Sequence, residues 1–156
     1  METAYIKTPL GTARITGDED GIAEISILSE GEPSKKIPKV LKESITQLND
    51  YFDGKRTGFD FKMNPKGTEF QQKVWQLLLE IPFGKTMSYM DLSKKFGDVK
   101  AIRAVASANG KNPLWIVVPC HRVIGADGSL TGYAGGLWRK KWLLEHESPT
   151  QQQSLF

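Results

Sequence analysis

The stretch LWIVVPCHRVIG, residues 114–125, places the only cysteine of this 156-residue chain at the end of an apolar run. Cys120 is followed by His121, one of two histidines, and by Arg122. A thiol becomes a nucleophile when a neighbouring base or cation promotes its ionisation. The stretch therefore allows two interpretations, a buried core cysteine or a reactive thiol. Features in the rest of the sequence are needed to decide between them.

The apolar run LWIVV predicts a short strand, which raises a geometric difficulty for a reactive thiol. Adjacent residues on an extended strand point to opposite faces, so the side chains of Cys120 and His121 would not touch. A bridging water or a turn at Pro119 would remove this difficulty. A carboxylate is also needed to orient the imidazole, and Glu145 and Glu147 in the last predicted helix are the candidates.

The small number of cysteines and histidines argues against a disulfide and against a structural zinc site. One cysteine cannot form an internal disulfide, and together with His121 and His146 it cannot build a closed structural zinc site without several carboxylates. We therefore expect no metal and no cofactor. A papain-like cysteine hydrolase is left as an alternative, although PCHR lacks the local signature of that family.

The bulk composition is typical of a soluble globular protein. The chain has 39% hydrophobic and 25% charged residues, and its length fits one domain or two small ones. The N-terminus METAYIKTPLG lacks the pattern of a secretory signal, and the longest apolar stretch is too short to cross a bilayer. We therefore expect a cytoplasmic protein.

Charge is distributed unevenly along the chain. Residues 1–63 contain 9 Lys and Arg against 11 Asp and Glu, whereas residues 64–156 contain 12 against 7. A basic second half suggests an anionic partner, although ordinary scatter of surface charge gives similar totals.

The first third of the chain is predicted to contain strands and one helix. TAYIKTPLG, TARITGD and GIAEISIL alternate apolar and polar residues between glycines, as short strands do. The segment KVLKESITQLNDYF, residues 39–52, is predicted to be a helix, with Ile37, Leu41, Ile45, Leu48 and Phe52 on one stripe. GFDFKM is predicted to be a further strand, and NPKG (64–67) a linker.

The second part is predicted to be helical, so the fold class is α/β (α+β). Thr68 and Gln71 have the spacing of a capping box at the start of one helix. Ser88 and Asp98 can cap two further short helices, which Gly97 separates as in a helix-turn-helix. Any small helical hairpin has the same pattern. A last helix, LWRKKWLLEHE, is expected to bury some of its apolar residues, Leu137, Trp138, Trp142 and Leu144 or their neighbours.

The third of these helices is rich in small residues, which let a helix approach a surface closely, while its two cations suit phosphates. Alanine is also simply the best helix former. The residues concerned are Lys100, Ala101, Arg103, Ala104 and Ser107.

The segment PCHRVIGADGSLTGYAGGLWRKKWLLEHE (119–147) resembles the active-site region of the O6-alkylguanine-DNA alkyltransferases, also called methylated-DNA–protein-cysteine methyltransferases. The likeness extends back through AIRAVASANGKNP and FQQKVWQLLLEIPFGKTMSYMDLSKKFG. It implies a DNA-binding and alkyl-acceptor domain over 64–148, with a winged helix-turn-helix-like fold, and a flexible tail over 149–156. Residues 1–63 resemble the family's small ribonuclease-H-like N-terminal domain in pattern only.

The resemblance implies direct-reversal DNA repair. Proteins of this family take an alkyl group from O6 of a damaged guanine onto their own cysteine, here Cys120. The displacement is in line and leaves a thioether, so each molecule acts once. The relay that deprotonates the thiol would run from Cys120 through a water to His121 and then to Glu147.

The resemblance also assigns roles around the damaged base. Tyr89 would donate a hydrogen bond near N3 of guanine, and Asn112 would brace the segment that enters the site. Tyr133 and Ala134 would wall the pocket, with the Ala134 backbone N–H reaching the guanine oxygen. The carbonyl of Val123 would accept from the exocyclic amine. Three of them also have a plain structural interpretation: Tyr89 as a half-buried helix residue, Tyr133 as a loop cover and Asn112 as a turn former before proline.

By resemblance the damaged nucleotide is rotated out of the duplex, at a cost on the order of a few kcal/mol. Arg103 would fill the vacated position, while the small-residue helix with Lys100, Ala101, Ala104 and Ser107 lies in the minor groove. The expected partner is double-stranded DNA containing O6-alkylguanine, bound by a monomer mainly through the DNA backbone.

The C-terminal tail carries a second signal. QQSLF (152–156) is similar to the pentapeptide by which bacterial DNA-processing proteins bind the replication sliding clamp. Leu155 and Phe156 would be the apolar anchors of that motif, and Gln152 would be its glutamine. The alternative is that Leu155 and Phe156 fold back on the domain.

Two rival functions are left open at this point. A non-catalytic alkyltransferase-like protein would recognise the lesion without reacting, but such relatives replace the cysteine that is present here. A cysteine hydrolase is the weaker rival. The zinc site of some relatives is absent because its cysteines are missing, and Trp138 with Lys140 and Lys141 changes surface detail, so the preferred alkyl group is not predicted.

Overall fold

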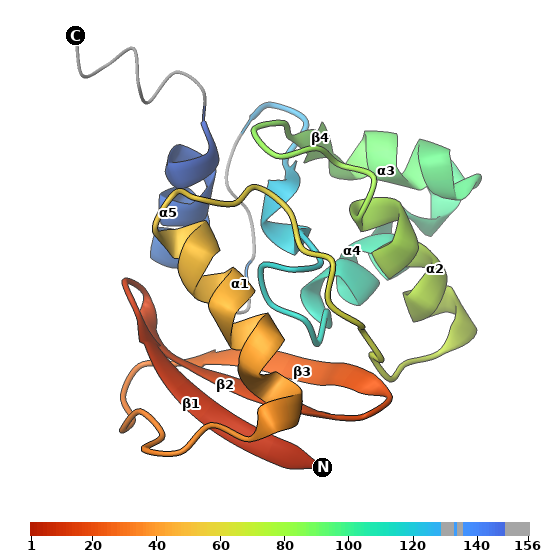
Figure 1. Ribbon diagram of the computed structural model, residues 1–156. Helices are drawn as coiled ribbons and strands as arrows, with labels where there is room; N and C mark the ends of the chain where they lie inside the picture. The colour runs from red at the N-terminus through yellow and green to blue at the C-terminus, as the bar shows by residue number, and fades with distance from the viewer. Residues whose placement is uncertain (129–132, 134–135, 149–156) are drawn as a thin grey trace, which may run out of the picture. The chain divides into compact units, whose positions relative to one another are not determined.

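The computed structural model describes residues 1–128, 133 and 136–148, and its contacts divide the chain into two units (Figure 1). Unit 1 consists of Met1–Lys66 together with Pro113–Val117. Unit 2 consists of Gly67–Asn112 and the described residues from Val118 onward. The boundaries expected from the sequence, between residues 63 and 64 and after residue 148, stay predictions.

Unit 1 is built on a three-stranded antiparallel sheet in the order β1-β2-β3, with strands β1 (Glu2–Thr8), β2 (Gly11–Asp18) and β3 (Gly21–Leu28). Each strand buries alternate apolar side chains, among them Ile6, Ile15 and Ile25, because neighbouring residues of a strand face opposite sides of the sheet. Gly21 begins β3 with a φ of +130°, and a side chain there would meet the Lys62 carbonyl oxygen at 3.0 Å. Glycine is therefore required at this turn.

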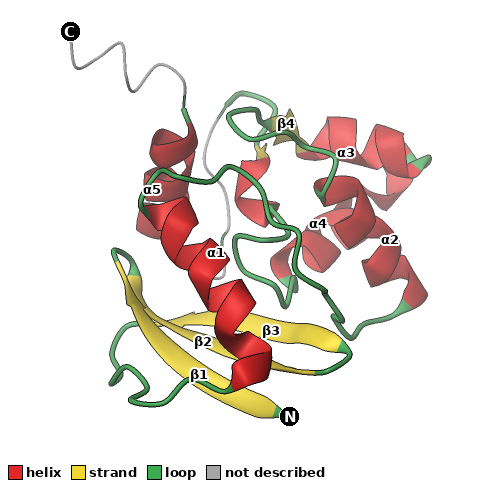
Figure 2. Ribbon diagram, in the orientation of Figure 1, coloured by secondary structure: helices red, strands yellow, loops and turns green. Residues whose placement is uncertain are grey.

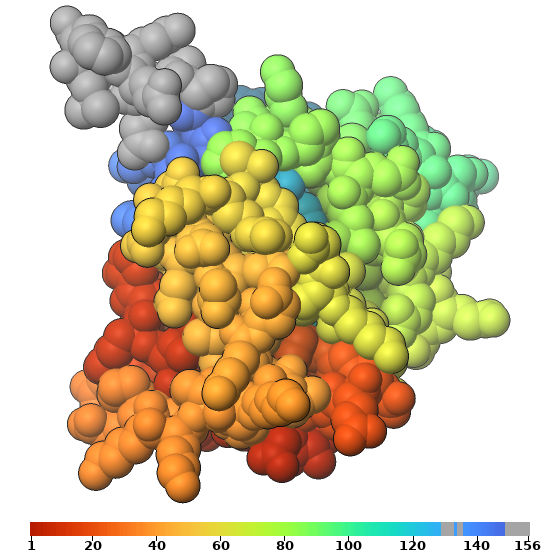
Figure 3. Space-filling model, in the orientation of Figure 1, coloured from red at the N-terminus to blue at the C-terminus, as the bar shows by residue number. Residues whose placement is uncertain are grey.

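A helix covers one face of this sheet, as the ribbon and space-filling views both show (Figures 1 and 3). A short 3-10 turn, η1 (Lys39–Leu41), leads into α1 (Lys42–Phe52). Leu41, Ile45 and Leu48 of the predicted stripe are buried, whereas Ile37 and Phe52 are half-buried. The apolar side of α1 and the apolar side of the sheet together form the core of unit 1.

Two predicted strands are wrong. In GFDFKM only Met63 pairs, through an isolated bridge to Ile22, because the backbone N–H of Asp60 donates instead to the Gln47 side chain at 3.0 Å. In LWIVV only Leu114 forms a bridge, and the chain then turns. Ile116 has a φ of +71°, which an extended strand does not contain. The apolar composition reflects burial, not strand geometry.

Unit 2 contains three helices whose starts were predicted by their caps (Figure 2). They are α2 (Glu69–Leu78), α3 (Tyr89–Phe96) and α4 (Ile102–Gly110), with a 3-10 turn, η2 (Val99–Ala101), ahead of α4. Thr68 and Gln71 form the predicted capping box, Ser88 caps α3, and Asp98 caps η2. The Trp75 indole donates to the Ala108 carbonyl at 2.9 Å and ties α2 to α4. The predicted helix-turn-helix arrangement is confirmed.

The remaining elements of unit 2 include the turn that contains Cys120. They are β4 (Met87–Ser88), which pairs in parallel with β5 (Val123–Ile124), the 3-10 turn η3 (Cys120–Arg122) and helix α5 (Leu137–Glu147). Helix α5 forms where predicted, but the expectation that it buries Leu137 and Trp138 is wrong. Those two side chains are exposed, and α5 buries Lys140, Leu143 and Glu147 instead. No helix among the described residues is long and apolar enough to span a membrane.

Candidate active site

Cys120 is the first residue of a 3-10 turn, not the end of a strand. The turn begins after Pro119, and the Cys120 N–H donates to the Val118 carbonyl at 2.8 Å. The side chain is buried, with 7% of its surface exposed. Because Cys120 and His121 occupy a turn, the strand geometry that would separate their side chains does not apply, which is one of the two solutions that the sequence left open.

His121 is paired with Glu147, the candidate carboxylate that lies on the buried face of α5. The imidazole Nε2 and the carboxylate Oε2 are 2.8 Å apart, and both side chains are buried. Burial alone would raise the pKa of the Glu147 carboxyl, but hydrogen bonds from His121 and Arg122 outweigh burial and lower the pKa to about 2. An ionised carboxylate only accepts hydrogen bonds, so the proton of the neutral imidazole is on Nε2.

The other ring nitrogen of His121 is consequently a free base. Nδ1 is buried and has no hydrogen-bond partner among residues 1–128, 133 and 136–148. Burial lowers the pKa of the imidazole despite the opposing effect of Glu147. A neutral imidazole with its proton directed at a carboxylate and its lone pair on the other side is what a general base requires.

Arg122, which the sequence analysis noted only as a neighbouring cation, holds the carboxylate in place. Its Nε donates to Glu147 Oε1 at 2.7 Å and its Nη2 donates to Oε2 at 3.0 Å. Its Nη1 donates to the Ile81 carbonyl at 2.8 Å. This bidentate pair fixes the orientation of Glu147 and satisfies the buried guanidinium. Glu145, the other candidate, is exposed and lies 4.0 Å from Lys141.

Asn112 contacts both the thiol and the backbone just before it. Its Nδ2 donates to the Val118 carbonyl and lies 3.3 Å from the sulfur of Cys120. The first bond holds the backbone that leads into the turn. The second places a donor where a negative charge on sulfur would develop.

The environment of the thiol explains why a base is needed. Burial raises the pKa of Cys120, against smaller lowering effects from the Asn112 hydrogen bond and the charge of Lys140. The net direction is upward, so the thiol is largely protonated near neutral pH. Deprotonation by a neighbouring base is therefore part of any reaction at this sulfur.

Lys140 was missed by the sequence analysis, which placed it at the surface. It is fully buried, and its ammonium group donates to the Val123 carbonyl at 2.7 Å. The spacing of Lys140, Leu143 and Glu147 is that of one helical face, so the periodicity was present in the sequence. Lysine is rarely buried, so this spacing alone does not predict the burial of Lys140.

Of the other residues assigned by resemblance, some are described by the structure and others are not. Tyr89 is half-buried at the start of α3, and the Lys140 ammonium lies 5.9 Å from the centre of its ring. Tyr133 is half-buried. Ala134 lies outside the described residues, and so do the three tail residues, Gln152, Leu155 and Phe156. Among the described residues, no group of three or more His, Cys, Asp and Glu side chains is arranged to hold a metal ion.

Comparison with known proteins identifies the family of the chain. The family model described as 6-O-methylguanine DNA methyltransferase, DNA binding domain, matches residues 69–149, and that of the ribonuclease-like domain matches residues 1–65. The chain belongs to the 6-O-methylguanine DNA methyltransferase family. The resemblance stated from the sequence is thereby confirmed.

Relatives in this family are similar over nearly the whole chain. The methylated-DNA–protein-cysteine methyltransferase of Methanosarcina acetivorans is 44% identical, over 94% of this chain and 98% of the relative. The Mycobacterium tuberculosis protein of the same name is 45% identical, over 91% and 89%. The crystal structure of Mycobacterium tuberculosis OGT in complex with DNA matches with a TM-score of 0.86 at 43% identity, over 94% of this chain and 93% of that chain.

Within the DNA-binding domain of the family, α4 and the turn η2 before it present the surface that the sequence singled out. Lys100, Arg103, Ala104 and Ser107 are exposed, and Ala101 is half-exposed. The opposite side of α4 is buried in unit 2, through Val105, Ala108 and Asn109. The small residues and the two cations therefore face solvent, where a ligand can reach them.

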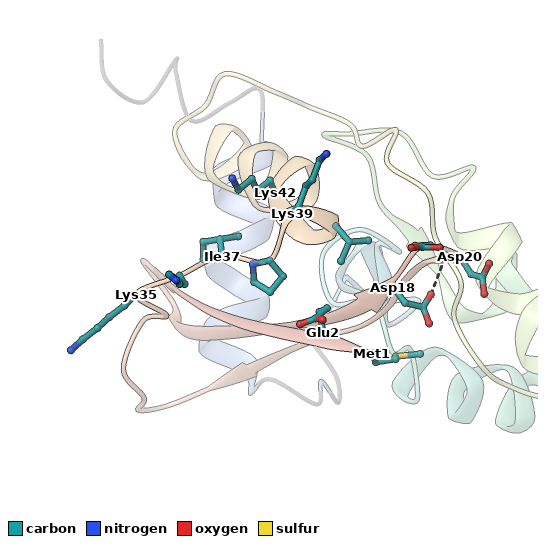
Figure 4. Close-up of a pocket in the computed structure, with 12 residues that line it drawn as sticks. Met1, Glu2, Asp18, Asp20, Lys35, Ile37, Lys39 and Lys42 are labelled. Atoms are coloured by element: carbon teal, nitrogen blue, oxygen red, sulfur yellow. Dashed lines mark hydrogen bonds between the residues drawn. The ribbon is translucent and has the colours of Figure 1, made fainter.

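The pocket drawn in Figure 4 belongs to the ribonuclease-like part and carries different chemistry. It has a volume of about 1140 Å³ and is lined by Met1, Glu2, Asp18–Asp20 and residues between Lys35 and Lys42. The labelled lysines lie toward one end and the labelled carboxylates toward the other (Figure 4). Cys120 and His121 do not line this pocket and belong to unit 2.

Proposed function

We propose that this protein repairs DNA directly, by taking the alkyl group from O6 of a damaged guanine onto Cys120. Membership of the family supports the reaction class, and the relatives compared above are named as methylated-DNA–protein-cysteine methyltransferases. The observation that carries the proposal is the bond between His121 Nε2 and Glu147 Oε2, because it leaves Nδ1 of a neutral imidazole as the base beside the only thiol.

The reaction begins with removal of the thiol proton. It passes from Cys120 through a bridging water to His121 Nδ1, and the resulting imidazolium is stabilised by the Glu147 carboxylate. The sulfur then attacks the alkyl carbon in line with the O6–C bond. A C–S bond forms, the C–O bond breaks, and its electron pair stays on the guanine, which takes up a proton. The thioether is stable, so each molecule reacts once.

The leaving guanine carries developing negative charge, and donors in a dry site stabilise such charge. We assign this role to Tyr89 near N3 and to the Ala134 N–H near O6. The Val123 carbonyl accepts from the exocyclic amine, Tyr133 walls the pocket, and Asn112 holds the turn that carries the sulfur. A carbonyl oxygen has two lone pairs, so Val123 can accept from the base while it also accepts from the Lys140 ammonium.

Double-stranded DNA containing O6-alkylguanine is the proposed partner of a monomer. The target atom is inaccessible inside a duplex, so the nucleotide is rotated out of the stack. Arg103 takes its place, while Lys100, Ala101, Ala104 and Ser107 allow α4 to lie against the minor groove, which is only ~6 Å wide. Exposure of the polar and small side chains of this helix supports the assignment.

A mass measurement tests the proposal. After incubation with a duplex containing O6-methylguanine, the intact protein should gain one methyl group, and Cys120→Ser should gain none. An alkyltransferase-like protein would bind the lesion without any change in mass. A hydrolase would be labelled only transiently. Either of these two outcomes rejects the alkyl transfer.

We propose in addition that QQSLF binds the bacterial sliding clamp through Gln152, Leu155 and Phe156. A pull-down with purified clamp should capture the full-length protein and lose it when residues 152–156 are deleted. Equal capture of both proteins rejects this proposal. A cytoplasmic location, expected from the sequence, also stays a prediction.

A further inference from the structure

Helix α5 carries a charge into the interior of unit 2. Lys140 has no exposed surface, whereas the next residue, Lys141, keeps 69% of its side chain exposed. A buried ammonium group is costly unless something in its surroundings favours the positive charge. The question is therefore which group in this protein makes a buried cation useful.

The neighbours of the ammonium group belong to the reactive site. It donates to the carbonyl of Val123, which closes the turn that begins at Cys120. It also lies over the ring of Tyr89, at 5.9 Å from its centre. Lys140 thus contacts two elements of the proposed reaction, the turn η3 with β5 and the start of α3.

The electrostatic interactions point to the sulfur. The positive charge of Lys140 lowers the pKa of the Cys120 thiol, and the thiolate in turn raises the pKa of Lys140, although burial is the larger influence on both groups. The charge of Lys140 also lowers the pKa of His121. Among the residues that the structure describes, charge interactions therefore link Lys140 to Cys120 and His121 of the turn, and the ring of Tyr89 from α3 lies near its ammonium group.

The second cation of the site is already engaged. Both donor groups at one edge of Arg122 are bonded to Glu147, at 2.7 and 3.0 Å. Its charge is thus balanced by that carboxylate, whose own pKa is about 2. When the thiol loses its proton, a negative charge appears in a desolvated place, and the Lys140 ammonium group brings a second positive charge to the same turn.

We propose that the ammonium group of Lys140 is the fixed counter-charge of the Cys120 thiolate. It acts on the sulfur through space and orders the turn through Val123, so it is a positioning residue and not a member of the proton relay. Its use in repair rests on the proposed function. The pairing itself is a property of the free protein and can be tested without DNA.

Titration of the single cysteine tests the pairing. Thiolate absorbance near 240 nm would be followed against pH, with Cys120→Ser as the baseline for the tyrosines. Lys140→Met should raise the pKa of the thiol by about one unit or more. Lys140→Arg keeps the positive charge, so its thiol pKa should stay close to that of the unaltered protein. Lys141→Met, which removes the neighbouring exposed charge, should change nothing. Equal thiol titrations in Lys140→Met and Lys141→Met overturn the proposal.

A reciprocal measurement leaves the lysine intact. It tests the pairing even if Lys140→Met does not fold. In protein labelled with 13C-lysine, the Cε signal of Lys140 should titrate at a lower pH in Cys120→Ser than in the unaltered protein, because the anion that favours the ammonium form is gone. Lys141 should titrate identically in both. Identical titrations of Lys140 in the two proteins contradict the pairing.

Methyl transfer then separates this inference from the proposed function. With saturating O6-methylguanine duplex, Lys140→Met should react about tenfold more slowly near neutral pH, with unchanged DNA affinity and a rate profile moved to higher pH. A structural defect alone would not move that profile. Should the unaltered protein transfer no methyl group while the thiol titrations differ as expected, the proposed function fails and the pairing stands.

Discussion

Glu147 is the residue on which the site depends most, because one carboxylate serves two partners. Its oxygens accept from His121 and from Arg122 within 3.0 Å. The first bond sets which nitrogen of the imidazole carries the proton, and the second keeps the carboxylate in place. Removing its charge therefore affects both the reaction and the stability of the fold.

Acid titration of stability measures the strength of this arrangement. The carboxyl pKa falls from 4.5 to about 2 on folding, so the stabilisation is complete above pH 4.5 and is lost as the pH falls toward 2. Its full size is on the order of 3 kcal/mol. We expect the free energy of unfolding of the unaltered protein, measured with urea, to fall steeply over this range. That of Glu147→Gln should be lower at every pH and should depend less on pH.

The matched control is Glu145→Gln, which removes an exposed carboxylate from the same helix. Its unfolding free energy should follow the unaltered protein within about 0.5 kcal/mol at every pH. A flat pH dependence in the unaltered protein, or an equally steep one in Glu147→Gln, would show that this carboxylate is not the group that titrates.

Single residues also mark the limit of what the sequence could predict about the site. Cys120, His121 and Glu147 could be found from chemistry and resemblance, and the structure places the latter two in contact. Lys140 could not, because composition treats lysine as a surface residue. Arg122 was noted for its charge alone, since its contact with the Ile81 carbonyl depends on tertiary packing.

At the scale of elements, local signals predicted helices well. Thr68, Ser88 and Asp98 all cap the turns expected of them, because capping involves residues two or three apart and needs no tertiary contact. The failures were GFDFKM and LWIVV, where apolar residues were interpreted as strands. Their backbone conformation depends on distant partners, which composition does not reveal.

The capping box of α2 should make a measurable contribution. Thr68 accepts from the Gln71 N–H at 3.1 Å, and the Gln71 side chain accepts from the Thr68 N–H at 3.0 Å. Thr68→Ala should lower the unfolding free energy by about 1 kcal/mol. Thr57→Ala, at an exposed threonine outside any helix, should lower it by much less. A loss in Thr68→Ala no larger than in Thr57→Ala would show that the cap is unimportant.

Helix α4 is the element that should read DNA. If Arg103 replaces the extruded nucleotide, Arg103→Ala should slow methyl transfer from a duplex about tenfold or more, because the open stack is no longer filled. Transfer from a single-stranded oligonucleotide, which has no stack to open, should change little. Rapid-quench kinetics on the two substrates would measure both rates.

Lys55→Ala, which removes an exposed cation from unit 1, is the control for net charge and should leave both rates unchanged. An equal slowing of duplex and single-strand reactions by Arg103→Ala would mean that this residue binds DNA without assisting base rotation.

On the scale of the whole molecule, the chain combines a nearly neutral first part with a basic second part that contains the thiol. The family models divide it in the same order, a ribonuclease-like domain followed by a DNA-binding domain. The return of Pro113–Val117 to unit 1 could not be foreseen, since it depends on a backbone pairing with β3 through Ile25. The reactive turn follows directly after this excursion.

Irreversible methylation of one sulfur per molecule is the result that this architecture should produce, and isotope mapping tests it most directly. Excess duplex carrying O6-trideuteriomethylguanine would be mixed with the full chain, and the digested protein sequenced by mass spectrometry. We predict the deuterated methyl group on Cys120 alone, one lesion lost per protein molecule, and no further loss with time. Label on another residue, or lesions lost in excess of protein, would contradict the account.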